Sequence, residues 1–439
     1  MSEGTVSMPT TPGSPAASGT ATQTRAAMTL RWVFLALVVA GNTINYVDRE
    51  IIALLKPLLE TQLHWTDLDY GRVVSAFQFA SIVAYMGAGW FLDSVGLRIG
   101  YPIAVATWSL FAMLNAAVRS VAGFTGIRVL LGVAEAGQTP AAVKTIAAWF
   151  SQRERALALG FMNVGSNLGT IITPLLVPPL ALAFGWRASF VITGALGFVW
   201  VIGWLAAYRG LPEELHPHRR VSATASPGAA RAPRWSALLV DRRAWAVGGA
   251  KFLSDAVWWF LLFWLPDFLH REYGLNLGTF GPPLAVIYTM ASVGALFGGV
   301  LPARMLSRGA SLNAARKTTL LLCAVAVLPI VFVLQIRDYW YAVLLVGLVL
   351  AAHQGFSTNV FALAADLFPE EAVGSVIGLG ALLGNLGGLA ILEATAQVLT
   401  RTGSYLPMFI YCACAYLLAL LVVQLLVPRI ESPPQTVPI

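Results

Sequence analysis

Apolar stretches of about 20 residues, the length that crosses a bilayer as an α-helix, recur along the whole chain. Short polar turns separate them, and the sequence predicts twelve such spans. The longest polar interruption, residues 210–243, is rich in Pro, Ser and Arg, as linkers are, and divides the spans six and six. The predicted spans are 30–55, 67–93, 97–118, 121–149, 154–184, 187–208, 244–269, 280–305, 314–335, 339–366, 373–399 and 404–427.

This pattern predicts an all-α membrane protein with two six-helix halves, residues 30–209 and 244–427, and a cytoplasmic linker, 210–243. The N-terminal tail, 1–29, is Ser-, Thr-, Gly- and Pro-rich and lacks the basic-then-apolar order of an export signal, so we expect it to be disordered. Lys and Arg concentrate in the loops on one side of the membrane, which predicts that both this tail and the C-terminal tail, 428–439, are cytoplasmic.

Composition supports a membrane protein and excludes several other classes. The chain is 57% hydrophobic and 11% charged, whereas soluble domains carry about 25% charged residues. The net charge of +7 comes from basic loops between spans, which does not indicate nucleic-acid binding. No metal-ligand cluster, nucleophile elbow or phosphate loop indicates an enzyme. We therefore expect neither a metal nor an organic cofactor.

Three adjacent ionisable residues lie in the first span, where charge is costly and therefore usually functional. Tyr46 and Arg49 share one helical face with Asn42, which predicts a polar stripe ending in a guanidinium that can pair bidentately with a carboxylate. Asp48 points about 100° away from this stripe. Glu50 is expected nearer the outer surface and is the weakest candidate of the group.

The fourth predicted span carries Arg128 and Glu135 among small residues that allow close helix packing. Counting depth at about 1.5 Å per residue places Asp48 level with Arg128, and Glu135 deeper, with Arg49 as its nearest base. We therefore expect an Asp48–Arg128 pair, and a Glu135 that takes up and releases protons in competition with an anion at Arg49. The alternative is a permanently paired network that only holds the two helices together.

Polar residues in four other spans are further candidates. Asn163 and Asn167 share a face, as do Gln354 and Ser357, and Asn385 lies among glycines; each could bind hydroxyls or bond between helices. Trp258 could stack on a sugar ring or simply pack. In the same span, Lys251 and Asp255 have the spacing of a helical ion pair, which we expect near the cytoplasmic end.

The turn after the second span reads Gly89…Asp93…Gly96…Arg98, and a partial copy, Gly298…Arg304…Gly309, recurs in the second half. With twelve spans and the six-plus-six division, this resembles the major facilitator superfamily. The resemblance implies that Asp93 and Arg98 form a cytoplasmic gate and that the two halves rock about a central site.

Longer stretches resemble one branch of that superfamily, the anion:cation symporters for hexuronates and galactonate. They are Asn45-Tyr46-x-Asp48-Arg49, Gly132-x-x-Glu135-x-Gly137-x-x-Pro140, Trp258-Trp259-x-x-Leu262-Phe263-Trp264-Leu265-Pro266, Gly309-x-Ser311-x-Asn313-x-Ala315-Arg316-Lys317 and Ala352-His353-Gln354. The resemblance implies that Arg49 binds the substrate carboxylate, that Tyr46 lines the site, and that Asp48 and Glu135 take part in proton coupling.

The sequence as a whole predicts a proton-coupled importer of a sugar acid monocarboxylate, a hexuronate or an aldonate, in a bacterial inner membrane. Its partners would be the anionic substrate, protons and lipid, and it would act as a monomer. The alternative is the same fold carrying another anion, such as a dicarboxylate, an aromatic acid or phosphate. A dicarboxylate would need a second cation in the cavity.

Overall fold

The computed structural model describes residues 16–209 and 235–430, which are almost entirely helical and contain no strand. Ten of its helical segments are long and apolar enough to cross a membrane. The 53-residue segment Leu157–Arg209 contains two crossings, and two shorter helices together supply one more. The twelve predicted spans are thus all present.

The first half is built from helices that begin and end close to the predicted boundaries. It comprises α1 (Ala16–Leu63), α2 (Asp67–Val95), α3 (Leu97–Leu114) with the 3-10 turn η1 (Asn115–Ala117), α4 (Val121–Glu135), α5 (Gln138–Trp149) and α6 (Gln152–Arg209). Helix α6 folds back on itself at Gly185, whose φ of 82° is a backbone conformation that favours glycine. The predicted span 121–149 is broken into α4 and α5 directly after Glu135.

The second half repeats this arrangement. It comprises the short α8 (Trp235–Val240), α9 (Arg242–Tyr273), α10 (Gly281–Ser307), α11 (Leu312–Val327) with the 3-10 segment η3 (Leu328–Gln335), α12 (Tyr339–Leu367), α13 (Glu370–Thr402) and α14 (Leu406–Leu426). Residues 210–234, which hold most of the predicted linker, lie outside the described residues. Large apolar side chains such as Met86, Leu296 and Ile202 are exposed on the outside of the bundles, as expected of a surface that faces lipid.

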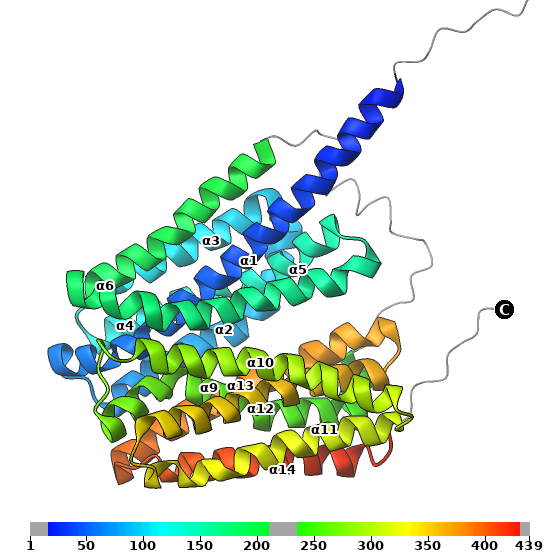
Figure 1. Ribbon diagram of the computed structural model, residues 1–439. Helices are drawn as coiled ribbons and strands as arrows, with labels where there is room; N and C mark the ends of the chain where they lie inside the picture. The colour runs from blue at the N-terminus through cyan, green and yellow to red at the C-terminus, as the bar shows by residue number, and fades with distance from the viewer. Residues whose placement is uncertain (1–15, 210–234, 431–439) are drawn as a thin grey trace, which may run out of the picture.

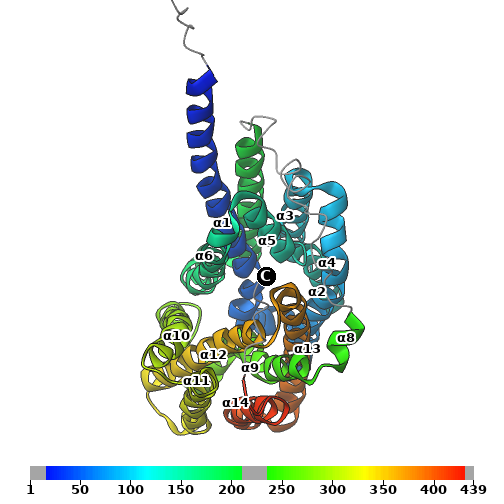
Figure 2. The same ribbon diagram turned by 90° about the vertical axis from the view of Figure 1, so that its right-hand side faces the viewer.

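The two halves form separate bundles that meet along three helix pairs, α1 with α9, α2 with α13, and α6 with α10. Figure 1 shows the bundles close together where α1 and α9 end and farther apart toward the N-terminus of α1. Figure 2 looks at the molecule from that second side and shows the two bundles standing apart. We refer to these as the closed end, at Leu63 and Tyr273, and the open end, at Ala16 and Arg242.

One difference from the predicted boundaries concerns the N-terminal tail. Helix α1 begins at Ala16 rather than near residue 30, so only residues 1–15 of the expected disordered tail lie outside the described chain. The added stretch, Ala16-Ala-Ser-Gly-Thr-Ala, is alanine-rich. Alanine has the highest helix propensity, and extending a helix that is already nucleated costs little.

Candidate functional site

A polar cavity of about 310 Å³ lies between the two halves, within the range of small-molecule sites. Helices α1, α6, α9, α12 and α13 supply most of its lining, and α10 contributes Ala295. Seven of the eight predicted substrate ligands are in its wall: Tyr46, Asn163, Asn167, Trp258, Gln354, Ser357 and Asn385. The structure therefore brings together residues that the sequence placed on five separate spans.

Arg49, the eighth, lies one side chain behind this wall. Its guanidinium carbon is 5.3 Å from the ring centre of Tyr46 and 5.6 Å from that of Trp259, and both rings line the cavity. The ring of Phe77 lies 5.4 Å away on the first half. Arg49 is 7% exposed. An anion in the cavity can therefore reach Arg49 only after Tyr46 or Trp259 moves.

The expected contact between Arg49 and Glu135 is confirmed. Nη2 and Nε of Arg49 donate to Oε2 of Glu135 at 3.0 and 3.3 Å, and both side chains are buried. Glu135 lies where α4 passes into α5, and the backbone of Ala136 and Gly137 stays in the right-handed helical region. The guanidinium of Arg49 compensates for the buried negative charge of Glu135.

The expected Asp48–Arg128 ion pair is wrong. The two charges lie near enough to interact electrostatically, but none of the ion pairs among the described residues, taken to 4.0 Å, joins them. Thr193 and Trp108 lie near Asp48, yet neither Asp48 oxygen accepts a hydrogen bond of normal geometry from a described residue. Arg128 is fully buried beside the Phe190 ring, with Nε and Nη2 equally without acceptors in the described chain. The count of residues along the helices predicted the depth of Asp48 and Arg128 but not the direction of their side chains.

Two further predicted ligands, Asn385 and Trp258, already have partners in the structure, as Arg49 does. Asn385 on α13 accepts a 2.6 Å hydrogen bond from Gln78 on α2, so this residue of the cavity wall also joins the two halves. Trp258 stacks on His353, with ring centres 5.4 Å apart, and His353 hydrogen-bonds to Tyr416. One face of Trp258 is therefore occupied by protein, and the indole is held in a fixed orientation.

The Lys251–Asp255 pair exists, at 2.8 Å, but not where the sequence analysis placed it. Lys251 and Asp255 both line the cavity, and Lys251 also donates to Ser357 at 2.9 Å. Because α9 begins at Arg242, Lys251 lies about 13 Å along the helix from its first residue, well inside the bundle. The second half therefore contributes a cation, Lys251, to the cavity. Counting about 1.5 Å per residue along the predicted span 244–269 would have placed Lys251 inside the bundle as well.

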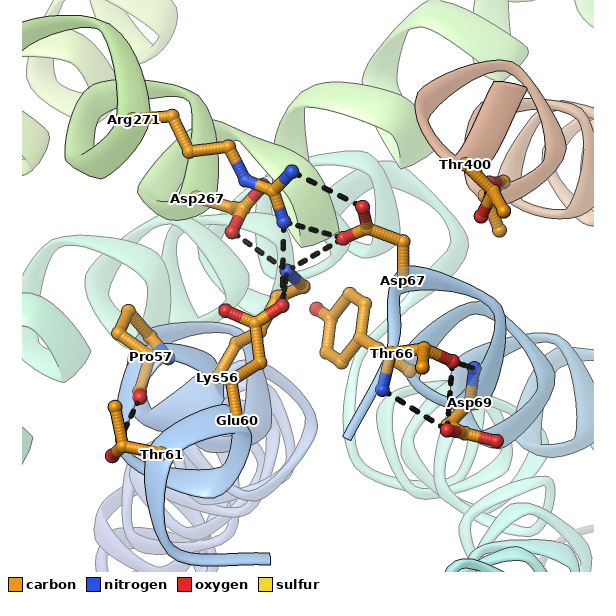
Figure 3. A network of polar contacts seen from close by, with 12 residues as sticks. Lys56, Pro57, Glu60, Thr61, Thr66, Asp67, Asp69, Asp267, Arg271 and Thr400 are labelled. Atoms are coloured by element: carbon orange, nitrogen blue, oxygen red, sulfur yellow. Dashed lines mark hydrogen bonds and ion pairs between the residues drawn. The ribbon is translucent and has the colours of Figure 1, made fainter. Parts of the chain in front are cut away.

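A second network of charges closes the other end of the seam between the halves (Figure 3). Lys56 of α1 contacts three carboxylates, Glu60 at 2.5 Å, Asp67 at 3.0 Å and Asp267 of α9 at 2.6 Å. Arg271 of α9 reaches back to Asp67 at 2.5 Å and Glu60 at 3.3 Å. We call these five residues the closed-end network; their contacts bind the first half to the second.

Asp267 is the most enclosed member of the closed-end network. Its Oδ1 accepts from Lys56, and its Oδ2 pairs with Arg271 Nε at 2.8 Å and accepts from the hydroxyl of Tyr405. Both its side chain and that of Lys56 are fully buried. Each oxygen therefore has a partner, as a buried charge requires.

The gate predicted at the open end, Asp93 with Arg98, has a different base in the structure. Asp93 pairs with Lys144 of α5, and Lys144 also donates to the carbonyl of Gly89 at 3.1 Å. Arg98 is exposed and pairs with no acid among the described residues. The turn itself is as predicted, because Gly96 has a φ of 80°. The base was misassigned because Lys144 is distant in sequence.

Comparison with known proteins places this architecture in a family. Residues 38–392 match the Major Facilitator Superfamily, which covers most of the chain. The chain belongs to this superfamily. It is accordingly a transporter and not an enzyme, and the resemblance inferred from its motifs is confirmed.

Within the Major Facilitator Superfamily, the chain is 29% identical to the hexuronate transporter of Escherichia coli K12 over 420 residues, 93% of this chain and 97% of that protein. It is 32% identical to the galacturonate transporter of Dickeya chrysanthemi over 281 residues, 62% of this chain and 81% of that protein. Its fold matches a crystal structure of a bacterial homologue of the human lysosomal transporter Spinster, with a TM-score of 0.69 and 16% identity over 91% of this chain and 96% of that one.

Proposed function

We propose that this transporter imports a sugar acid monocarboxylate together with protons across a bacterial inner membrane. The substrate would be a hexuronate such as galacturonate or glucuronate, or an aldonate such as galactonate. The observation that carries the proposal is the Arg49–Glu135 pair directly behind a polar cavity. Relatives named as hexuronate and galacturonate transporters support the substrate class.

The buried pair suggests how substrate and proton would be coupled. Glu135 occupies the guanidinium of Arg49 through one oxygen, whereas a substrate carboxylate could take the same donors bidentately. Two carboxylates cannot both be neutralised by one guanidinium in a buried site. Protonation of Glu135 would free Arg49 for the substrate, and release of the proton would expel it. Asp48, buried nearby without hydrogen bonds from the described chain, would be a second proton acceptor.

The rest of the cavity would bind the sugar body. Amide and hydroxyl groups of Asn163, Asn167, Gln354 and Ser357 face one space and can both donate and accept. Tyr46 and Trp258 would offer ring surface to the apolar face of a sugar. With both termini cytoplasmic, as the basic loops predict, the closed end would face the periplasm and the cavity would open inward.

Substitution of Arg49 tests the substrate site. We expect Arg49→Ala to abolish saturable uptake of galacturonate into proteoliposomes, because the guanidinium beside Tyr46 and Trp259 is lost and Lys251, in the cavity wall, is already paired with Asp255. Arg31→Ala, which removes a partly exposed arginine from the same helix, is the matched control and should leave uptake near wild type. Unchanged uptake by Arg49→Ala would overturn the proposal.

Substitution of Glu135 tests the coupling. Glu135→Gln keeps the shape of the side chain but cannot exchange a proton, so uphill uptake driven by a pH gradient should be lost while substrate exchange across the vesicle membrane continues. Both activities are measured in the same proteoliposome preparation. Uptake that still responds fully to the pH gradient would show that the proton binds elsewhere.

A sugar diacid is a second candidate substrate, because Lys251 supplies the second cation that such a substrate would need. Lys251 lies two helical turns, about 12 Å, from Trp259 on α9, and the Arg49 guanidinium carbon lies 5.6 Å from the ring centre of Trp259. Competition distinguishes the candidates. If galactarate inhibits galacturonate uptake more strongly than galactonate does, and Lys251→Met removes only that difference, the diacid is the better substrate; equal inhibition favours the monocarboxylate.

A further inference from the structure

Glu50 of α1 is a buried carboxylate that the proposed coupling does not use. It is 3% exposed, and neither of its oxygens accepts a hydrogen bond of normal geometry within the described chain. Although it neighbours Arg49 in sequence, the guanidinium of Arg49 is directed at Glu135. The sequence analysis placed Glu50 near the outer surface; the structure places it inside, between the central site and the closed end.

The surroundings of Glu50 straddle the two halves. It faces a narrow crevice that has no room for a water molecule, with α1 and α6 on one side and α9 and α10 on the other. The other lining residues are almost all apolar: Ala53, Leu54, Pro174, Leu262, Pro266, Leu284 and Tyr288. Glu50 therefore lies in the seam that must separate when the closed end opens.

The titratable and charged groups that face Glu50 are few. On its own helix they are Arg49 and Tyr46; from α10 it is the hydroxyl of Tyr288. The neutral hydroxyl of Thr173 approaches from α6. None of the ion pairs among residues 16–209 and 235–430 includes Glu50.

An ionised carboxylate in a dry, apolar seam without an ionic partner is strongly disfavoured, and such a group takes up a proton instead. A protonated Glu50 can donate one hydrogen bond to the hydroxyl of Tyr288 or Thr173, which suits the groups around it. When the halves part at the closed end, water reaches the carboxyl and the ionised form becomes acceptable.

We infer that Glu50 is a proton-binding site in the seam, and that the closed end can close only when this site is protonated. The inference rests on the proposed function only in assuming that the halves alternate; it requires no particular substrate. It adds a proton site on the boundary between the halves to the one proposed at Glu135 inside the first half. Closing would then carry a proton from the compartment at the closed end into the protein.

The linkage has a definite sign. The closed conformation binds one more proton than the open one, so acidification favours closure. The closed-to-open ratio changes by up to tenfold per pH unit over the range in which Glu50 is protonated in the closed form and ionised in the open form. Replacement by Gln mimics the protonated carboxyl and removes this dependence. Replacement by Leu matches the apolar seam and should also hold the end closed at every pH.

The test measures the closed end directly, without substrate. Exposed Thr61 and Glu272, on opposite halves, are replaced by Cys and spin-labelled in a full-length protein whose Cys323, Cys412 and Cys414 are Ser. Pulsed electron resonance then gives the distance distribution between pH 5 and 8. We expect the short-distance population to grow as pH falls in the parent protein, and to be large and independent of pH in Glu50→Gln and Glu50→Leu.

The matched control is Glu135→Gln, which removes the other proposed proton site but leaves the seam intact and should keep the pH dependence. A full pH response in both Glu50 variants would overturn the inference, as would a parent protein whose distances do not change with pH. Failure of the sugar-acid proposal would appear only in uptake assays and would leave these distances unaffected.

Discussion

The closed-end network and the central cluster use the same types of charged residue but differ in how completely those residues are satisfied. At the closed end, Lys56 holds three carboxylates, and both oxygens of Asp267 have partners. In the central cluster, Asp48, Arg49, Arg128 and Glu135, the ion pair found is Arg49–Glu135, and Glu135 Oε1, both Asp48 oxygens and two Arg128 nitrogens have no hydrogen bond in the described chain.

The two regions also differ in what they connect. The closed-end network joins α1 and α2 of one half to α9 of the other, whereas all four members of the central cluster belong to the first half. A satisfied network between two bodies stabilises one arrangement of them. An incompletely satisfied cluster within one body gains little from its present charge state, so a proton or an anion can change it at low cost. The first region is suited to hold a conformation and the second to respond to a ligand.

The largest effect should come from Lys56→Met. Removing the ammonium leaves three carboxylates that share Arg271 as their remaining base, and Asp267 Oδ1 loses its buried partner, a change that costs up to about 3–5 kcal/mol. We expect a marked fall in thermal stability in detergent and a shift of the Thr61–Glu272 distance to longer values. Lys144→Met, at the half-exposed pair with Asp93, is the control and should change neither by much. An unchanged closed end in Lys56→Met would mean that Lys56 is not needed to hold the halves together there and that Arg271 and apolar packing suffice.

A smaller and more discriminating effect should separate Asp267→Asn from Asp48→Asn. An amide at 267 loses charge-assisted bonds from two bases, so a loss of about 2–3 kcal/mol is expected. An amide at 48 gives up no hydrogen bond and relieves a buried charge, so unfolding should change by less than about 1 kcal/mol in either direction. Thermal unfolding of the two variants, side by side, measures the difference. If both variants lost the same free energy of unfolding, the two regions would not differ in how completely their charges are satisfied.

The smallest effect should follow Asp93→Asn at the open end. The carboxylate is 73% exposed and the Lys144 side chain 32%, and exposed pairs contribute about 0–1 kcal/mol. Thermal stability should therefore barely move, and uptake should remain measurable. If stability instead falls as far as in Asp267→Asn, the Asp93–Lys144 pair is a structural contact that its exposure conceals.

Much of the fold follows from the sequence, because membrane spans are read from local features. Length and apolar content fixed the spans, and helical periodicity grouped Tyr46 with Arg49 and Asn163 with Asn167. Adjacent residues on one helix keep their relation whatever the helix packs against. This is why seven residues predicted as ligands, from five spans, meet at one cavity. Their role in binding a substrate stays a prediction.

Contacts between distant segments were accessible only in part. Lys56 and Asp267 are 211 residues apart, and no local feature of the sequence indicates that their side chains form an ion pair. Counting depth along a span assigned Glu135 to Arg49 correctly, although the depths expected for Glu50 and Lys251 were wrong. Rotation and rotamer cannot be counted in this way, so Asp48 and Arg128 were wrongly joined. The break after Glu135 was missed because Ala136-Gly137 lies in a stretch as apolar as its neighbours.

The hydrogen bond from Gln78 to Asn385 links substrate selectivity to the rate of transport as well as to binding affinity. It joins the two bundles, and its acceptor residue, Asn385, lines the cavity. If the substrate is a sugar acid, as proposed, a hydroxyl that donates to the Asn385 oxygen in place of Gln78 would exchange one bond for another of similar strength, so binding would be nearly neutral at this point. The hydrogen bond between the two bundles, however, would then be broken. An analogue without that hydroxyl would bind almost as well and leave the halves tied, and would be recognised as a slow substrate rather than a weak one.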